Sequence, residues 1–129
     1  MCLLGAARAG AELLAALPRP DLRAFYAWVP MLPPDTESAA QAAAQRFAEP
    51  RASHYWDGGR HLSAAVGAAL GIDNAPAGRL AWDVYLAYPR GEIALGRPDF
   101  WMHQLNEHDA PRLDAAVFRQ RIEMLLDAS

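Results

Sequence analysis

The sequence predicts a single α/β domain spanning residues 1–129, in which helices cover a central mixed sheet. The chain has 129 residues, the size of one domain, and 53% of them are hydrophobic, which is enough to build a core without disulfides. Apolar residues recur at helical spacing in some segments and gather in short aromatic or β-branched runs in others. Because the two kinds of segment alternate, at least part of the sheet is expected to be parallel.

The first half of the chain is predicted to run helix, strand, helix, strand. Apolar residues at helical spacing indicate helices at 3–17 and 39–47, and each is closed by a proline shortly after its end. Asp35 is expected to cap the second helix. The aromatic run 22–29 and the shorter segment 52–56 are predicted to be strands.

The second half is predicted to comprise, in order, a helix at 62–70, a loop at 73–79, a strand at 82–88, a partner strand at 92–95 and an irregular stretch at 97–111. The two strands flank the turn residues Pro89–Gly91, which is typical of a hairpin. Asp114 is placed to cap a last helix. Its predicted core face comprises Val117, Phe118, Ile122, Leu125 and Leu126.

Charge and composition exclude several classes of protein. The net charge is −3, and the 12 basic residues, all arginine, are scattered, so we expect no nucleic-acid partner. No stretch approaches the ~18 apolar residues of a membrane span, so no membrane partner is expected either. A single cysteine, Cys2, allows no internal disulfide, and with no signal peptide the cytoplasm is the expected location. No cofactor motif, such as a Gly-rich phosphate loop, is present.

The order of elements resembles the thioredoxin superfamily, in particular its peroxiredoxin-like branch, over residues 2–127. Cys2-Leu3-Leu4-Gly5 at the start of the first helix is similar to a Cys-x-x-Cys motif in which Gly5 replaces the second cysteine. Tyr55-Trp56-Asp57 followed by a helix, and Trp82–Tyr88 followed by Arg90–Ile93, are similar to later parts of that fold. The resemblance implies a C-terminal hairpin and helix, and thiol chemistry at Cys2.

The sequence departs from that family in three places. The resolving cysteine is absent, so a two-cysteine redox cycle is excluded. Leu80-Ala81 stands where the family has a cis-proline facing the cysteine. The family's central first strand has no counterpart, and we expect another segment or a second subunit to occupy its place, since unpaired backbone groups in a sheet are costly. Direct pairing of the strands at 25–29 and 82–88 would contradict this expectation.

Cys2 is the first candidate for a catalytic residue. A thiol at a helix N-terminus is activated, because the helix dipole and the free N–H groups favour the thiolate. Pro30, Met31 and Trp56 are expected to be its neighbours. Asp35 and Asp57 follow strand ends, where α/β folds bind ligands. The alternative roles are structural: a small residue at a frayed chain end for Cys2, and turn or cap residues for the two aspartates.

The segment Asp99–Leu105 is the second candidate, because Trp101 and His103 are unusual residues for a loop. His103 could carry protons or bind a metal. No pair of histidines has a ligand spacing such as H-x-x-x-H, so no metal ligand is assigned. The alternative is that Trp101 plugs the edge of the sheet while His103 makes backbone hydrogen bonds.

Three functions remain open. The favoured one is a thioredoxin-like protein that lacks dithiol activity and acts through a single thiol, as an oxidoreductase or as a binder of a protein or peptide. The second is a metal-binding or enzymatic domain centred on His103. The third is a homodimeric interaction module without chemistry.

Overall fold

The computed structural model describes residues 2–72, 80–91, 93–104 and 111–128, and these form a mixed α/β structure with two small sheets. The loop predicted at 73–79, and His108, lie outside the described residues. No helix in the described part is long and apolar enough to cross a membrane.

The predicted first helix is present and contains a π-helical turn. It consists of α1 (Leu3–Ala6), η1 (Ala7–Ala11) and α2 (Glu12–Ala16), which follow one another without a break. A π turn adds one residue to the helical repeat. Positions eight apart therefore share a face across η1, and the buried residues of α1 line up with the buried Leu13 and Leu14 of α2.

The first two strands pair in parallel, as the alternation of helices and strands predicts. β1 (Ala24–Trp28) and β2 (Ala52–Trp56) run in register from Ala24 opposite Ala52 to Trp28 opposite Trp56. Their connection is α3 (Glu37–Arg46), which packs on β2. Tyr26 and Trp28 alternate with exposed residues and stack against Phe47 after α3, so only one face of this sheet is covered.

The remaining helices lie where the sequence predicts them. α4 (His61–Leu70) ends at Gly71, whose φ of 70° lies in the left-handed region that glycine adopts readily. α5 (Ala115–Asp127) begins after Asp114, whose carboxylate accepts a hydrogen bond from the Val117 N–H at 3.0 Å. Phe118 and Ile122 are buried as predicted, whereas Val117 is exposed.

The predicted hairpin is wrong in its second strand. β3 (Val84–Ala87) pairs in antiparallel with β4 (Phe100–His103), from the stretch predicted to be irregular. Residues 93–95 form no strand, and Ile93 is exposed. Both faces of β4 find apolar partners: Phe100 and Met102 pack towards α5, and Trp101 packs towards α4. Burial on two faces therefore outweighs the local turn signal at 89–91.

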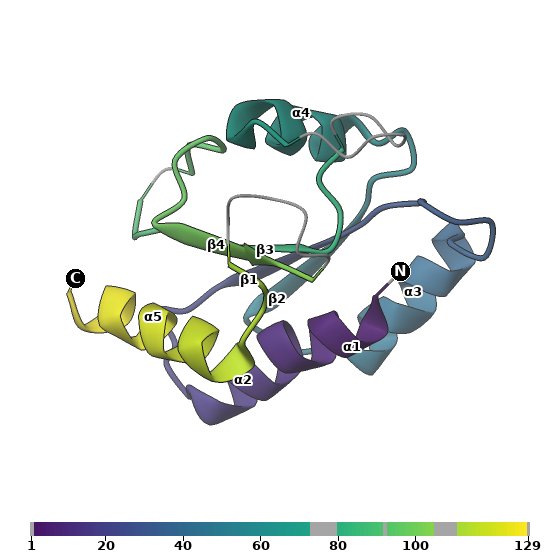
Figure 1. Ribbon diagram of the computed structural model, residues 1–129. Helices are drawn as coiled ribbons and strands as arrows, with labels where there is room; N and C mark the ends of the chain where they lie inside the picture. The colour runs from purple at the N-terminus through teal and green to yellow at the C-terminus, as the bar shows by residue number, and fades with distance from the viewer. Residues whose placement is uncertain (1, 73–79, 92, 105–110, 129) are drawn as a thin grey trace.

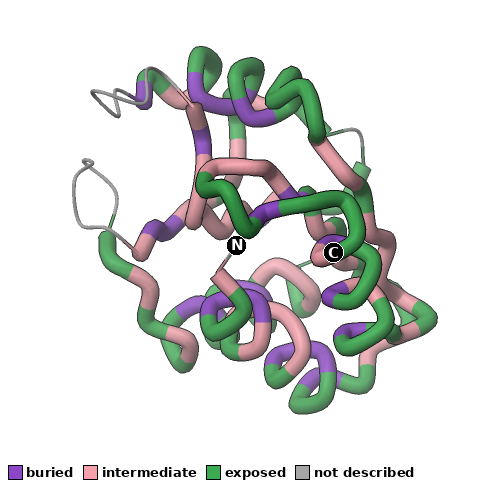
Figure 2. Tube along the Cα trace, turned by 90° about the vertical axis from the view of Figure 1, so that its right-hand side faces the viewer, coloured by how far each residue is buried: buried purple, intermediate pink, exposed green. Residues whose placement is uncertain are grey.

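The elements form three layers (Figure 1). α5, α2, α1 and α3 lie along one side of the strands, and α4 lies alone on the other. Along the helices, buried positions alternate with exposed ones (Figure 2). The core consists of separate clusters: one joins α2, β3, β4 and α5 and another joins α1, β1 and α3, while a smaller one lies under α4.

A single central sheet was expected, and the structure has two sheets of two strands each. Among the described residues, β1 pairs only with β2 and β3 only with β4. In the described residues, the strands at 25–29 and 82–88 are thus not paired with each other, and the expectation that another segment or a second subunit lies between them stays a prediction.

The prediction that Asp35 caps α3 is wrong. The cap is Thr36, whose hydroxyl accepts a hydrogen bond from the Ala39 N–H at 3.1 Å. The Asp35 carboxylate instead accepts hydrogen bonds from the Met31 and Leu32 N–H groups, at 3.0 and 2.9 Å. A bend through 31–35 brings those two N–H groups closer to Asp35 than the first turn of the helix.

Candidate functional site

Cys2 lies at the N-terminus of the long helix and is part of its cap. Its Sγ accepts a hydrogen bond from the Gly5 N–H at 3.4 Å, and the residue is half-buried. The N–H groups at the start of a helix lack partners within the helix and carry partial positive charge. The sulfur therefore lies where the backbone stabilises negative charge, as the sequence predicted.

Tyr85 of β3 lies against Cys2 and Gly5. Its hydroxyl donates a hydrogen bond to the Gln104 Oε1 at 3.0 Å. Burial raises the pKa of Tyr85, and the nearby Cys2 raises it further. A Cβ at position 5 would overlap the Tyr85 hydroxyl. Gly5, which stands where a second cysteine would be, is thus needed for the close approach of the helix to β3.

Asp83 is the next residue of this site. It has a φ of 52°, uncommon for a residue other than glycine, and its carbonyl accepts a hydrogen bond from the Gln104 N–H at 3.1 Å. Burial raises the pKa of Asp83, and the Asp35 carboxylate raises it further. Asp83 also raises the pKa of Tyr85. Negative charge on Cys2 or Asp83 thus acts on Tyr85, and negative charge on Asp35 acts on Asp83.

The other residues predicted near Cys2 have structural partners. The Pro30 carbonyl accepts a hydrogen bond from Arg60 at 2.8 Å, and Met31 belongs to the Asp35 turn. Trp56 packs against the cluster around Trp28. Of the predicted site residues, the structure links Asp35 to the Cys2 end through its interaction with Asp83.

Asp57 caps α4. Its carboxylate accepts hydrogen bonds from the Leu62 and Ser63 N–H groups at 3.3 and 2.8 Å. The structural alternative considered for this residue is therefore sufficient to explain it.

Trp101 and His103 lie on β4, not in a loop. The His103 side chain is only 1% exposed, and its backbone N–H and C=O bond to Pro111 and Leu113. Within the described ranges, no group of three or more His, Cys, Asp or Glu residues could hold a metal ion. The described residues thus give His103 a buried place on β4, and its catalytic or metal-binding role stays a prediction.

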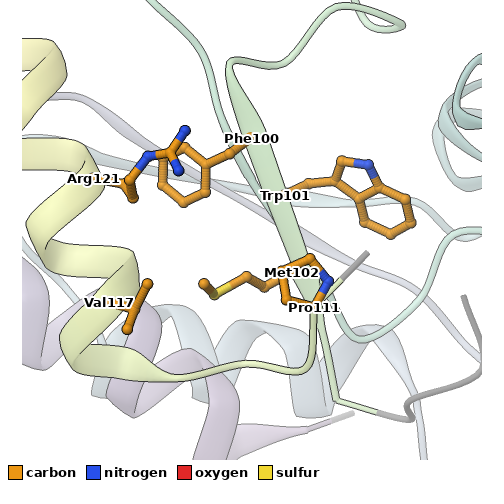
Figure 3. Close-up of a pocket in the computed structure, with 6 residues that line it drawn as sticks. All are labelled: Phe100, Trp101, Met102, Pro111, Val117 and Arg121. Atoms are coloured by element: carbon orange, nitrogen blue, oxygen red, sulfur yellow. The ribbon is translucent and has the colours of Figure 1, made fainter. Parts of the chain in front are cut away.

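A shallow apolar pocket lies beside β4 (Figure 3). It has a volume of about 360 Å³ and is lined by Phe100, Trp101, Met102, Pro111, Val117 and Arg121. Phe100 and Met102 point to the opposite side of the strand from Trp101. The Arg121 guanidinium lies 4.8 Å from the centre of the Phe100 ring and 3.6 Å from the Asp99 carboxylate. The pocket offers apolar contact and one cation, but no nucleophile.

Sequence reasoning did not place Tyr85, Asp83 or Gln104 beside the start of the long helix. Tyr85 looked like any strand residue, and nothing in the sequence marks the left-handed backbone of Asp83. Tyr85 and Gln104 meet Gly5 only because the helix crosses over the start of β3, which is a property of the tertiary packing.

Comparisons with known proteins identify no relative: no family model, curated protein or solved structure matches this chain. The fold and the site are thus described by their own geometry.

Proposed function

We propose that this protein is a thioredoxin-like domain that acts through a single thiol, Cys2. The observation that carries the proposal is the hydrogen bond from the Gly5 N–H to the Cys2 Sγ at the start of the helix, at 3.4 Å. The order of helices and strands supports the family assignment, since a helix bearing the cysteine precedes a parallel strand pair and an antiparallel pair with a final helix.

The chemistry consistent with one thiol is disulfide exchange with a partner. The Cys2 thiolate attacks one sulfur of a partner disulfide, a new S–S bond forms, and the other sulfur leaves as a thiolate. A second thiol from outside the chain, such as glutathione, then attacks the mixed disulfide and releases Cys2. The N–H groups at the start of the helix stabilise the charged sulfur, and the Tyr85 side chain lies beside it.

The test is the rate at which iodoacetamide alkylates Cys2 at neutral pH, in the native protein and in the same protein unfolded in urea. Stabilisation by a helix N-terminus predicts a native rate about two- to fivefold above the unfolded rate. Tyr85→Phe should lower the native rate, because it removes a hydroxyl next to the sulfur. Tyr88→Phe is the matched control, since the Tyr88 hydroxyl bonds to the Leu95 carbonyl instead.

A native rate equal to or below the unfolded rate would overturn the proposal. So would failure to form a mixed disulfide with oxidised glutathione, measured as a mass increase that a reductant reverses.

A further inference from the structure

β1 has an unpaired edge opposite β2. The Ala24 N–H donates to the Arg51 carbonyl at 3.0 Å, and the Trp28 carbonyl accepts from the Asp57 N–H at 2.9 Å. Backbone groups alternate in direction along a strand, so those of Ala24, Tyr26 and Trp28 point to β2. The N–H and C=O groups of Phe25 and Ala27 point to the other edge, where the described part of the chain provides no strand.

β3 has a matching unpaired edge. The Gln104 N–H donates to the Asp83 carbonyl at 3.1 Å, which makes these two residues a hydrogen-bonded pair. By the antiparallel alternation, Tyr85 and Ala87 also bond to β4, while Val84 and Leu86 point away from it. Within the described ranges β3 pairs with no other strand.

The long helix packs on both β1 and β3. Ala6 and Ala11 on one side of the helix pack with the cluster that contains Trp28 of β1. Ala9 and Leu13 on the other side pack with the cluster that contains Ala87 of β3. The long helix therefore packs on both β1 and β3, on one side of the strands (Figure 1).

Within the described parts of the chain, no charge, proline or covering strand protects the outward edges of β1 and β3. Proteins block free strand edges with charged residues, proline or a covering segment. β1 (AFYAW) and β3 (VYLA) contain no charge and no proline. The outer edge of β4 is covered, because His103 bonds to residues 111 and 113. Among the described residues, the outward edges of β1 and β3 are therefore uncharged and have no strand partner.

We infer that an extended, uncharged apolar segment of a partner polypeptide inserts between β1 and β3 and joins the two sheets into one. Such a segment needs about five residues without proline, because each strand offers a few outward backbone groups and adjacent strands lie about 4.8 Å apart. It must be apolar on the face that the long helix covers, because that helix packs on both β1 and β3. The inference does not depend on the reactivity of Cys2.

The probe is a fluorescein-labelled peptide with the core Val-Leu-Val-Ala-Val between terminal lysines, and binding is measured by anisotropy. Two further peptides are N-methylated, one at the odd and one at the even core positions. Successive N–H groups of an inserted strand point to opposite neighbours, so each methylated peptide should bind at least about tenfold more weakly. Equal binding of either methylated peptide would overturn the inference, since it would indicate pairing with one edge only.

Amide hydrogen exchange locates the bound peptide. The amides of Phe25, Ala27, Val84 and Leu86 should exchange fast in the free protein and slow down together when the peptide binds. Ala27→Pro, which removes one donor at the β1 edge, should also weaken binding about tenfold. Slow exchange of the four amides in a peptide-free dimer, identified by light scattering, would overturn the inference in favour of a second copy of the chain.

Discussion

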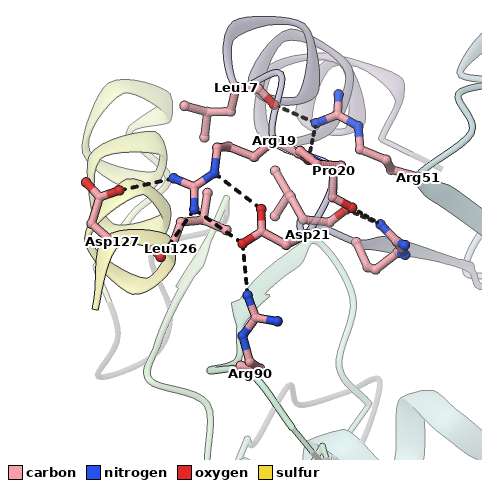
Figure 4. A network of polar contacts seen from close by, with 10 residues as sticks. Leu17, Arg19, Pro20, Asp21, Arg51, Arg90, Leu126 and Asp127 are labelled. Carbon is pink, nitrogen blue, oxygen red and sulfur yellow. Dashed lines mark hydrogen bonds and ion pairs between the residues drawn. The ribbon is translucent and has the colours of Figure 1, made fainter. Parts of the chain in front are cut away.

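Arg51 is the side chain that ties the end of the long helix to the strands. Its guanidinium donates hydrogen bonds to the carbonyls of Leu17 and Arg19, at 2.5 and 3.1 Å (Figure 4). It also donates to the Leu14 carbonyl at 2.7 Å, and its Nε pairs with Glu49 at 2.8 Å. The last carbonyls of a helix have no partner within it, and a cation there also interacts favourably with the helix dipole. This one residue therefore satisfies several orphan carbonyls.

Replacing Arg51 with methionine, which keeps most of the apolar stem, should lower the free energy of unfolding by about 2–3 kcal/mol, because buried carbonyls lose charged donors. Urea denaturation measures this. Arg51→Lys should also lower the free energy of unfolding, but by less than Arg51→Met. Its single ammonium group lacks the planar set of donors with which the guanidinium bonds several carbonyls at once.

Arg90→Met is the control for this substitution. The Arg90 side chain is 64% exposed and pairs only with Asp21, so its loss should cost less than about 1 kcal/mol. A similar cost for both substitutions would show that Arg51 acts as an ordinary surface charge.

The residues of the candidate site show what the sequence can and cannot predict. Cys2 was predicted because helix starts and thiols have local signatures. Tyr85 and Asp83 were not, because their role depends on how closely Gly5 lets the helix approach β3. His103 attracted attention by its type alone, and its burial on β4 shows that residue type without exposure is a weak guide.

At the scale of elements, the π turn η1 sets which residues of the long helix face the two sheets. It adds one residue, so the buried positions before it stay in phase with Leu13 and Leu14 after it. A regular α-helix would keep the same phase with one residue fewer, because two of its turns take about seven residues.

Deleting Arg8, which is exposed within η1, should therefore convert the π turn into an α turn and change the free energy of unfolding by less than about 1 kcal/mol. Inserting one alanine after Arg8 should rotate the leucines of α2 by about 100° and cost more than about 4 kcal/mol. Thermal unfolding followed by circular dichroism compares the two. Equal losses would mean that the phase of the helix does not control its packing.

Helices and the first strand pair were predictable because their signals are periodic and local. The boundaries of β2 and α5, and the glycine after α4, follow from such signals. The strand that pairs with β3 was not predictable. The turn at 89–91 indicates a short hairpin, whereas the apolar side chains of β4 become buried only after the chain has folded around them.

For the whole molecule, two half-buried tyrosines link stability to alkaline pH. Burial raises the pKa of both Tyr26 and Tyr85 above the usual value near 10. In the unfolded chain these tyrosines lose their protons first, so above about pH 10 the unfolded state binds fewer protons than the folded state. The contribution to stability is complete below pH 10 and is lost as pH rises towards the folded-state pKa.

We expect the free energy of unfolding to fall above pH 10 by up to about 1.4 kcal/mol per pH unit for each of the two tyrosines. Tyr26→Phe and Tyr85→Phe should each make this fall less steep in urea titrations at pH 9 to 11. Tyr55→Phe, at an exposed position, should leave the slope unchanged. If the free energy of unfolding falls equally steeply with pH in all three variants, Tyr26 and Tyr85 are not the cause of the fall.

The two separate sheets also bear on how the molecule unfolds. No strand hydrogen bonds connect the β1–β2 half with the β3–β4 half in the described structure, so the helix from Leu3 to Ala16 provides much of the coupling between them. Such halves are natural units of partial unfolding. The free chain should therefore lose its structure in two stages of different calorimetric enthalpy, and a strand that bridges them would merge these into one cooperative transition.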